Sequence, residues 1–377
     1  MSGEPRLADR DKAIVEAMAA AGLERLVLAS NGLHMIDLPN PVLHLTGFRS
    51  VGPCFVCLEA DGTSLAIAAP ADDGERLERH FGSGSFACDE PASALAMRLA
   101  ATPRLTGTVG FGALPHRLAG RVLAALPDGS LAFDRPFYRC SGPKTAAEIA
   151  RARRATEIAE QGYAHLKRMA RPGMRECDLA VTVNLFMKEL GADDSFLMLN
   201  AGPRSEAVMP SSERPMQRGD LILAELSPSV EGQFVQICRT ICLGEPPDAT
   251  RQAYDLLVGA MSAGIALVRP GRKMGDVCRA VDDFLSEAGY AEYSRPPFIR
   301  RRGHGLGGGS TFPGDVAVDN ETILEEGMLF IVHPNQYLPD TGYMMCGDPL
   351  VVGHEGPIVL SNALASLASA IGEGAGP

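Results

Sequence analysis

Three polar side chains in the C-terminal half of the chain interrupt or end apolar runs of strand length. Glu225 follows LILA, Gln236 stands within FVQIC, and His333 follows LFIV. An apolar run of this length is typical of a buried strand, and a polar group carried into the interior without a partner costs about 1–3 kcal/mol. These side chains therefore need a partner in the fold, a ligand or a metal ion.

His304 adds a second imidazole, in the glycine-rich strip GHGLGGG. Imidazole titrates near neutral pH, which suits proton transfer, and a carboxylate can orient it. We therefore predict His304, His333 and Glu225 as catalytic residues. Gln236 and Arg239 are predicted to bind the substrate, with Arg239 supplying positive charge. The alternative is a buried polar network that only holds two parts of a domain together.

Other site motifs lack the context that they need. Residues 303–308 satisfy GxGxxG, but STFP follows at 310–313, where a dinucleotide-binding fold needs a helix. The chain has no GxSxG strip, so a serine hydrolase has no support. Cys54 and Cys57 form a CxxC without a second pair to complete a zinc site, which favours a structural role.

The composition is that of a packed, acidic globular protein. The 377 residues include 35 basic and 46 acidic side chains, a net charge of −11, which argues against binding to nucleic acid or anionic membranes. No run approaches the roughly 20 apolar residues of a membrane span, and the first residues are polar where a signal peptide needs an apolar core. The 9 scattered cysteines are typical of buried thiols rather than of a disulfide framework. We predict a cytoplasmic protein.

Strand and helix periods alternate from residue 6 to about residue 136. Apolar strips predict strands at 25–30 and 42–48, and a hairpin at 54–70 with Asp61-Gly62 in its turn. Helical spacing marks segments before and after these strands. Such alternation indicates a small α/β domain with a mixed sheet.

A long connector helix leads into a second domain. The strip from 143 to 170 predicts the longest helix of the chain, which ends at the RPG turn of 171–173. A second helix starts at Glu176, and the order helix, RPG turn, helix recurs from 262 to 290. The repeat predicts a pseudo-symmetric domain with its active site between two halves. The glycine-rich end of the strip 364–377 is expected to fray.

These strips resemble the pita-bread metallopeptidases, the family of aminopeptidase P, prolidase and methionine aminopeptidase, with their non-peptidase relative creatinase. The resemblance covers nearly the whole chain, through VLHLTGF near the start and RPGM, GDLIL, CRT, GHGLG, LEEGMLFIVHP and GDPLVV later. It implies an α/β (α+β) protein. Residues 1–143 are expected to form a creatinase-like N-terminal domain, and 144–377 the pita-bread catalytic domain.

The family's peptidases hold two divalent metals with two Asp, one His and two Glu. By resemblance these five places fall, in chain order, at Glu225, Gln236, His304, His333 and Gly347, or at Cys346 for the last if the alignment slips by one residue. Only the His keeps its type. Four carboxylates balance two cations in the family, whereas Glu225 alone brings about one negative charge. A dinuclear centre is therefore not expected.

The resemblance then favours a metal-independent, creatinase-like hydrolase that cleaves a C–N bond (amide, amidine or lactam) of a small polar metabolite. The catalytic His and Glu of creatinase would fall near Val208 and at Cys238, so its own mechanism does not carry over. One alternative is a mononuclear metallohydrolase or Xaa-Pro peptidase-like enzyme in which Glu225, His304 and His333 hold one divalent metal ion. A lyase or cyclase and a non-catalytic binding protein are the others.

The family also implies a partner, a second copy of the chain. Relatives dimerise so that the N-terminal domain of one subunit closes the active site of the other, and Arg49 is placed by this analogy to reach a neighbour's substrate. Tyr337 and Asp348 are predicted to line the substrate pocket. No cofactor is expected apart from the alternative single metal ion, and no nucleic-acid or membrane partner.

Overall fold

The computed structural model describes residues 8–362 and 366–370. The chain divides into two compact units, Met1–Gly142 and Pro143–Pro377. None of the helices within these described residues is long and apolar enough to cross a membrane.

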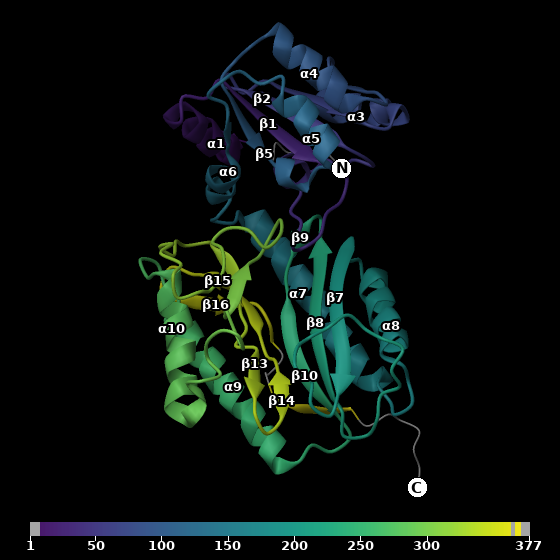
Figure 1. Cartoon of the computed structure of the whole chain (residues 1–377), viewed down its shortest axis with the longest axis vertical. Helices are drawn as coiled ribbons and strands as arrows, with labels where there is room; N and C mark the ends of the chain where they lie inside the picture. The colour runs from purple at the N-terminus through teal and green to yellow at the C-terminus, as the bar shows by residue number, and fades with distance from the viewer. Residues whose placement is uncertain (1–7, 363–365, 371–377) are drawn as a thin grey trace. The chain divides into compact units, whose positions relative to one another are not determined.

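The N-terminal unit is built on a six-stranded mixed sheet (Figure 1). Its strand order is β4-β3-β2-β1-β5-β6, with β1 antiparallel to β2 and parallel to β5. The strands are β1 (Arg25–Ser30), β2 (Cys54–Glu59), β3 (Ser64–Ala68), β4 (Phe86–Ala87), β5 (Thr106–Val109) and β6 (Leu131–Ala132). The pairing of β2 with β3 confirms the hairpin predicted at 54–70.

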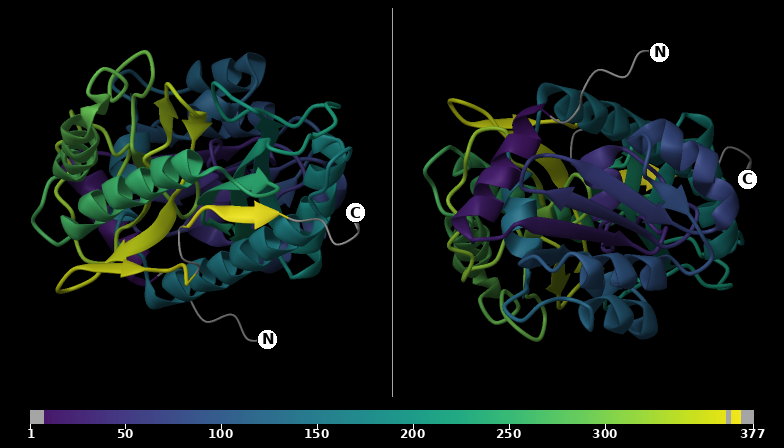
Figure 2. Two further views of the ribbon diagram at one scale, coloured as in Figure 1. Left: turned by 90° about the horizontal axis from the view of Figure 1, so that it is seen from below. Right: turned by 90° about the horizontal axis from the view of Figure 1, so that it is seen from above.

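Helices cover both faces of this sheet (Figure 2, right). They are α1 (Ala8–Ala20), α2 (Pro41–Thr46), α3 (Gly74–Phe81), α4 (Pro91–Ala101), α5 (His116–Leu123) and α6 (Asp134–Cys140), with the short 3₁₀ turns η1 (Ala71–Asp73) and η2 (Phe111–Ala113). Successive residues of β1 alternate between the faces: Leu26 and Leu28 pack in one core, and Val27 and Ala29 in the other. The all-apolar strip 25–30 is therefore a central strand buried on both sides.

The strand predicted at 42–48 is wrong, because the strip VLHLT forms helix α2. Asn40 caps its start by accepting a hydrogen bond from the Leu43 backbone N–H, and Pro41 supplies the φ angle of the first helical residue. Gly47 ends the helix at φ 71°, a left-handed conformation that favours glycine. An apolar run of this length can form a strand or a helix, and here the capping residues Asn40 and Gly47 favour the helix.

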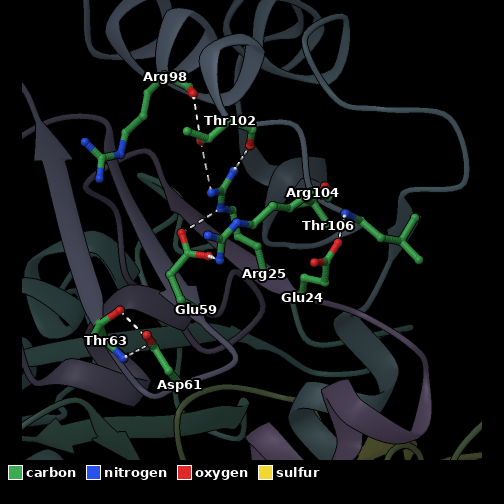
Figure 3. Close-up of polar contacts among 10 residues, drawn as sticks. Glu24, Arg25, Glu59, Asp61, Thr63, Arg98, Thr102, Arg104 and Thr106 are labelled. Atoms are coloured by element: carbon green, nitrogen blue, oxygen red, sulfur yellow. Dashed lines mark hydrogen bonds and ion pairs between the residues drawn. The ribbon is translucent and has the colours of Figure 1, made fainter.

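The buried side chain of Arg25, the first residue of β1, bonds to Glu59 at the end of β2 and to the residue that follows α4 (Figure 3). The Arg25 side chain donates from Nε to Glu59 Oε1 at 2.8 Å and from Nη1 to the Thr102 carbonyl at 3.1 Å. Glu59 also accepts from Arg104, whose side chain is 47% exposed whereas that of Arg25 is 4% exposed. The buried Arg25 and the exposed Arg104 therefore both pair with the carboxylate of Glu59.

We expect Arg25→Ala to destabilise the full chain by about 3 kcal/mol, because it removes the buried partner of Glu59. Arg104→Ala is the matched control and should cost less than about 1 kcal/mol, since its ion pair is exposed. Urea unfolding followed by circular dichroism measures both. Equal losses from the two variants would contradict the account.

The C-terminal unit contains two helix pairs and two main sheets. The helices are α7 (Ala146–Met169), α8 (Glu176–Glu189), α9 (Asp248–Ala266) and α10 (Met274–Leu285), with a π-helical turn η3 (Ser286–Tyr290). Thr145 and Glu148 form a capping box that starts α7, the predicted connector helix. The order of helices confirms the repeat predicted from the sequence.

Each helix pair packs against its own sheet (Figure 1). The first sheet runs β17-β10-β8-β7, with β9 paired to β8: β7 (Asp194–Gly202), β8 (Leu221–Val230), β9 (Gln233–Phe234), β10 (Ile237–Leu243) and β17 (Ala368–Ala370). The second runs β11-β12-β15-β16: β11 (Gly303–Gly305), β12 (Leu329–Val332), β15 (Asp348–Val352) and β16 (Pro357–Val359). A hairpin of β13 (Gln336–Leu338) and β14 (Gly342–Met344) completes the unit.

Two further sequence predictions can be placed. Residues 309–328, which follow the GxGxxG strip at 303–308, form turns and isolated bridges but no helix, so the helix that a dinucleotide-binding fold needs there is not formed. Within the strip 364–377, β17 pairs with β10 in a parallel arrangement. The glycine-rich end, 371–377, which is expected to fray, lies outside the described part of the chain.

Candidate active site

A buried ion pair joins the two sheets of the C-terminal unit behind the candidate site. Arg239 on β10 is fully buried and donates to Asp348 Oδ1 on β15 at 2.6 Å. It also donates to the backbone carbonyls of Cys238 and Gly347, at 2.9 and 2.7 Å. Cys238 and Gly347 in turn exchange two backbone hydrogen bonds, at 3.1 and 3.0 Å. Arg239 and Asp348, predicted to bind substrate, thus bind each other.

Glu225 lies on β8, directly opposite Cys238 on β10. Its Oε1 accepts from Asn335 Nδ2 at 3.4 Å and lies 4.0 Å from the Cys238 Sγ. Burial, and after it the charge of Glu225, raises the pKa of Cys238 well above its usual value. The thiol therefore stays protonated and can donate to the carboxylate.

Gln236 and Ser227 share the sheet face of Glu225. The register is the same on both sides of Gln236, at Ile237↔Leu226 and Phe234↔Ser229, so Gln236 stands opposite Ser227. Side chains alternate between faces along a strand, which puts both on the face of Glu225. Gln236 Oε1 and Ser227 Oγ are buried without a hydrogen-bond partner.

The two histidines come from the other sheet and lie side by side. His304 is on β11 and His333 follows β12, with ring centroids 5.3 Å apart in an edge-on arrangement. The His304 Nδ1 lies 2.9 Å from the Gly305 carbonyl, which can only accept, so Nδ1 carries the proton. The Nδ1 of His333 is buried and has no hydrogen-bond partner.

His333 is held in its neutral form. Burial lowers its pKa well below the usual value, and the neighbouring His304, Arg301 and Arg302 lower it further. A positive charge on His304 therefore opposes one on His333. The pair is built to carry at most one added proton near neutral pH.

Gly347 brings the two halves of the site together through close packing. A Cβ at Gly347 would lie 2.5 Å from the His333 Cβ and 3.2 Å from the Cys238 Cβ. His333 therefore stands against the backbone of residue 347, next to the strand position opposite Glu225. Any side chain at 347 would therefore crowd the Cα and Cβ of residue 333.

The family's metal pair does not fit this donor set. Of its five places only Glu225 offers a carboxylate, and Gly347 has no room for a side chain. Across residues 8–362 and 366–370, no three or more His, Cys, Asp or Glu side chains are grouped so that they could hold a metal ion.

The remaining predicted residues are spread over both units. Tyr337 is on β13, where its hydroxyl accepts from Arg204 Nη2 at 3.2 Å. Arg49 is in the N-terminal unit, after α2, and its carbonyl accepts from Arg76. The role of Arg49 at a neighbour's site stays a prediction.

Sequence reasoning missed Asn335 and Tyr343. Asn335 comes two residues after His333 and is 3% exposed. Tyr343 on β14 receives a side-chain hydrogen bond from Asn335, and burial followed by the charge of Glu225 raises its pKa. The position of Asn335 just past His333-Pro334 was a usable signal. No local sequence pattern marks Tyr343, because only the pairing of β14 with β13 places its side chain near the site.

Comparisons with known proteins agree with this architecture. Residues 150–354 match metallopeptidase family M24. The uncharacterized peptidase YqhT of Bacillus subtilis is 27% identical over 216 residues, 56% of this chain and 60% of that protein. The probable dipeptidase PepE of Mycobacterium tuberculosis is 28% identical over 222 residues, 58% of each chain. The matched segment thus spans about three fifths of the length of these relatives.

Solved structures match over nearly the whole chain. The Xaa-Pro dipeptidase from Bacillus anthracis superposes with a TM-score of 0.81 at 22% identity, covering 96% of this chain and 99% of the other. The prolidase from Thermococcus sibiricus gives 0.84 at 23% identity, covering 98% and 100%. The fold is therefore that of the pita-bread peptidases, as predicted. Because the family match spans more than half of the chain, the chain belongs to metallopeptidase family M24.

The neutral His333 makes stability depend on pH. Its folded-state pKa lies below the unfolded value, so as pH falls below about 6.5 the unfolded chain gains a proton that the folded chain refuses, and stability decreases. We expect His333→Gln to weaken this dependence between pH 6.5 and 5, by up to about 1.4 kcal/mol per pH unit. Urea unfolding at several pH values gives the slope. His354→Ala, at a side chain that is 84% exposed, should leave it unchanged.

The packing at Gly347 gives a second test. Gly347→Ala should destabilise the protein by about 1–3 kcal/mol, because the new methyl group meets the Cβ of His333. Gly356→Ala is the control, since a Cβ there meets no atom closer than 3.9 Å. Thermal unfolding compares the two. If Gly347→Ala proves as mild as its control, the close approach of the two strands is not a constraint.

Proposed function

We propose that this chain is a metal-independent hydrolase that cleaves a C–N bond of a small polar metabolite, such as an amide, amidine or lactam. The observation that supports this most directly is that His304 lies beside a buried, neutral His333, at positions where, by resemblance, the family's peptidases hold metals. The family's relatives are named as peptidases and dipeptidases, which supports hydrolysis of a C–N bond. The loss of the metal donor set supports a different way of activating water.

In this proposal His333 is the general base and His304 the general acid. His333 stays neutral near pH 7 and can accept a proton from water as the water oxygen adds to the substrate carbon. The C–N bond then breaks, and the proton that His333 took from water passes by way of the neutral His304 to the leaving nitrogen, so that the pair never carries more than one added proton. The mutual repulsion of the two charged rings favours this division into one base and one acid.

Glu225 and Gln236 would hold the substrate rather than move the proton. Glu225 is fixed by its contacts with Asn335 and Cys238, and Gln236 shares its sheet face. A fixed carboxylate and amide can orient the head group against the two imidazoles, which is a large part of catalysis when the reacting atoms must be aligned.

The partner and the location remain part of the proposal. We propose a homodimer in the cytoplasm in which Arg49 of one subunit reaches the substrate of the other, on the analogy of relatives with this fold. The absence of a membrane-spanning helix from the described residues is compatible with this location.

The test is turnover after metal removal. Protein dialysed against EDTA and 1,10-phenanthroline is offered a panel of small amides, amidines and lactams, and released ammonia or amine is measured. We expect turnover that survives chelation and falls by about 10²-fold or more in His333→Gln. His354→Ala should keep full activity.

The other outcomes separate the alternatives. Turnover lost on chelation and restored by zinc, manganese or iron would establish a mononuclear metallohydrolase instead. Hydrolysis of Xaa-Pro dipeptides under the same metal dependence would establish a peptidase of the family's ordinary kind. No turnover on any substrate, with binding retained, would favour a non-catalytic protein.

A further inference from the structure

The β13–β14 hairpin divides its side chains cleanly between core and site. Gln336, Leu338 and Met344 are 0–1% exposed and face the core. Tyr337 and Tyr343 are direct partners across the hairpin, so both side chains point to its other face. Both are half-buried, which leaves part of each ring accessible.

Tyr337 continues outward into an aromatic row. Its ring stacks on Phe298 with centroids 5.6 Å apart and planes 21° apart, and Tyr293 lies 6.0 Å from it and 5.0 Å from Phe298. Gln336 fixes this arrangement, because its Nε2 donates to the carbonyls of Tyr293 and Tyr337, each at 2.8 Å. We call Tyr343, Tyr337, Phe298 and Tyr293 the aromatic row.

The inner end of the row meets Glu225. Tyr343 receives a hydrogen bond from the Asn335 side chain, and Asn335 Nδ2 donates to Glu225 Oε1 at 3.4 Å. The backbone of Asn335 is held by Arg302, which donates to its carbonyl at 3.3 Å. The aromatic row therefore begins at Phe298, which is 36% exposed, and its inner end is linked through Asn335 to the carboxylate of Glu225.

Acceptor atoms gather at this inner end. The contact with Glu225 fixes the orientation of the Asn335 amide, because only the amide nitrogen can donate to a carboxylate. The amide oxygen, Oδ1, is then buried without a partner. Gln236 Oε1 and Ser227 Oγ are buried without partners on the sheet face of Glu225. Buried acceptors that the fold leaves unsatisfied are suited to N–H donors of a ligand.

Three arginines near the site form ion pairs within the fold. Arg239 pairs with Asp348 at 2.6 Å, Arg302 with Asp282 at 2.7 Å, and Arg301 with Asp315 at 3.1 Å. The inner end of the row offers the carboxylate of Glu225 beside the buried oxygens of Asn335, Gln236 and Ser227. These acceptors favour a cationic head group with N–H donors over a carboxylate.

We propose that the site selects ligands with a cationic, N–H-rich head group, an amidinium or guanidinium, attached to a flat apolar body. The head group donates to Glu225 and to the oxygens of Asn335 and Gln236, while the body lies against Tyr337 and Phe298. Flat cations gain both from the carboxylate and from the faces of aromatic rings. The inference deepens the proposed function, because it assigns a substrate class to the same site.

The probes are benzamidine, acetamidine and benzoate, which separate head group from body. The measurement is isothermal titration calorimetry on the full chain. We expect benzamidine to bind at least about tenfold more tightly than either of the others, a difference of about 1.4 kcal/mol. Glu225→Gln should remove the preference over benzoate.

Substitutions in the aromatic row test whether the flat body of the ligand adds to its affinity. Phe298→Leu and Tyr337→Leu should bring the affinity for benzamidine down toward that for acetamidine, whereas Tyr337→Phe should keep it. Phe284→Leu is the matched control, because Phe284 is also 36% exposed and lies on α10 outside the row. It should bind benzamidine like the unchanged chain.

Three results would overturn the inference: no binding of benzamidine at millimolar concentration, equal binding of benzoate, or unchanged affinity in both row variants. Binding does not require turnover. Failure of the hydrolase proposal would therefore leave the benzamidine preference intact, and loss of the preference would leave metal-free hydrolysis of other substrates standing.

Discussion

The C-terminal unit depends on one buried cation, the guanidinium of Arg239. A charge taken out of water must be matched by partners, because breaking a buried ion pair costs several kcal/mol. Arg239 finds these partners on the opposite sheet, in the carboxylate of Asp348 and the carbonyl of Gly347. The strand end at 347 is thereby drawn against β10 at Cys238, and the spacing of the whole site follows from that contact.

Close backbone packing at 347 then decides which side chains the site can hold. Gly347 lets the Cα and Cβ of His333 approach its backbone, and the imidazole of His333 lies beside His304. The glycine at 347 and the histidine at 333 stand where, by resemblance, the family's peptidases have Glu. Because neither residue is a carboxylate, the site lacks most of the negative charge that two divalent cations require. What remains is a neutral base, a second imidazole and one carboxylate.

Much of this arrangement could be predicted from the sequence, for physical reasons. Glu225, Gln236 and His333 interrupt or end apolar runs, and burial of those runs carries them inward. That Glu225 and Gln236 share a face follows only from the register of β8 with β9 and β10. Asn335 and Tyr343 were not found, since their approach to Glu225 depends on a hairpin register that no local pattern encodes. The strip 42–48 was misassigned because its caps, Asn40 and Gly47, outweigh β-branched and apolar content in a short segment.

Our central proposal is that this member of metallopeptidase family M24 does not hold the metal pair of its family. The most direct measurement is metal content by inductively coupled plasma mass spectrometry, on protein purified without chelator and again after dialysis against zinc, manganese and iron. The account predicts occupancy near zero in every sample. About one ion per chain, lost in His333→Gln and kept in His354→Ala, would contradict it.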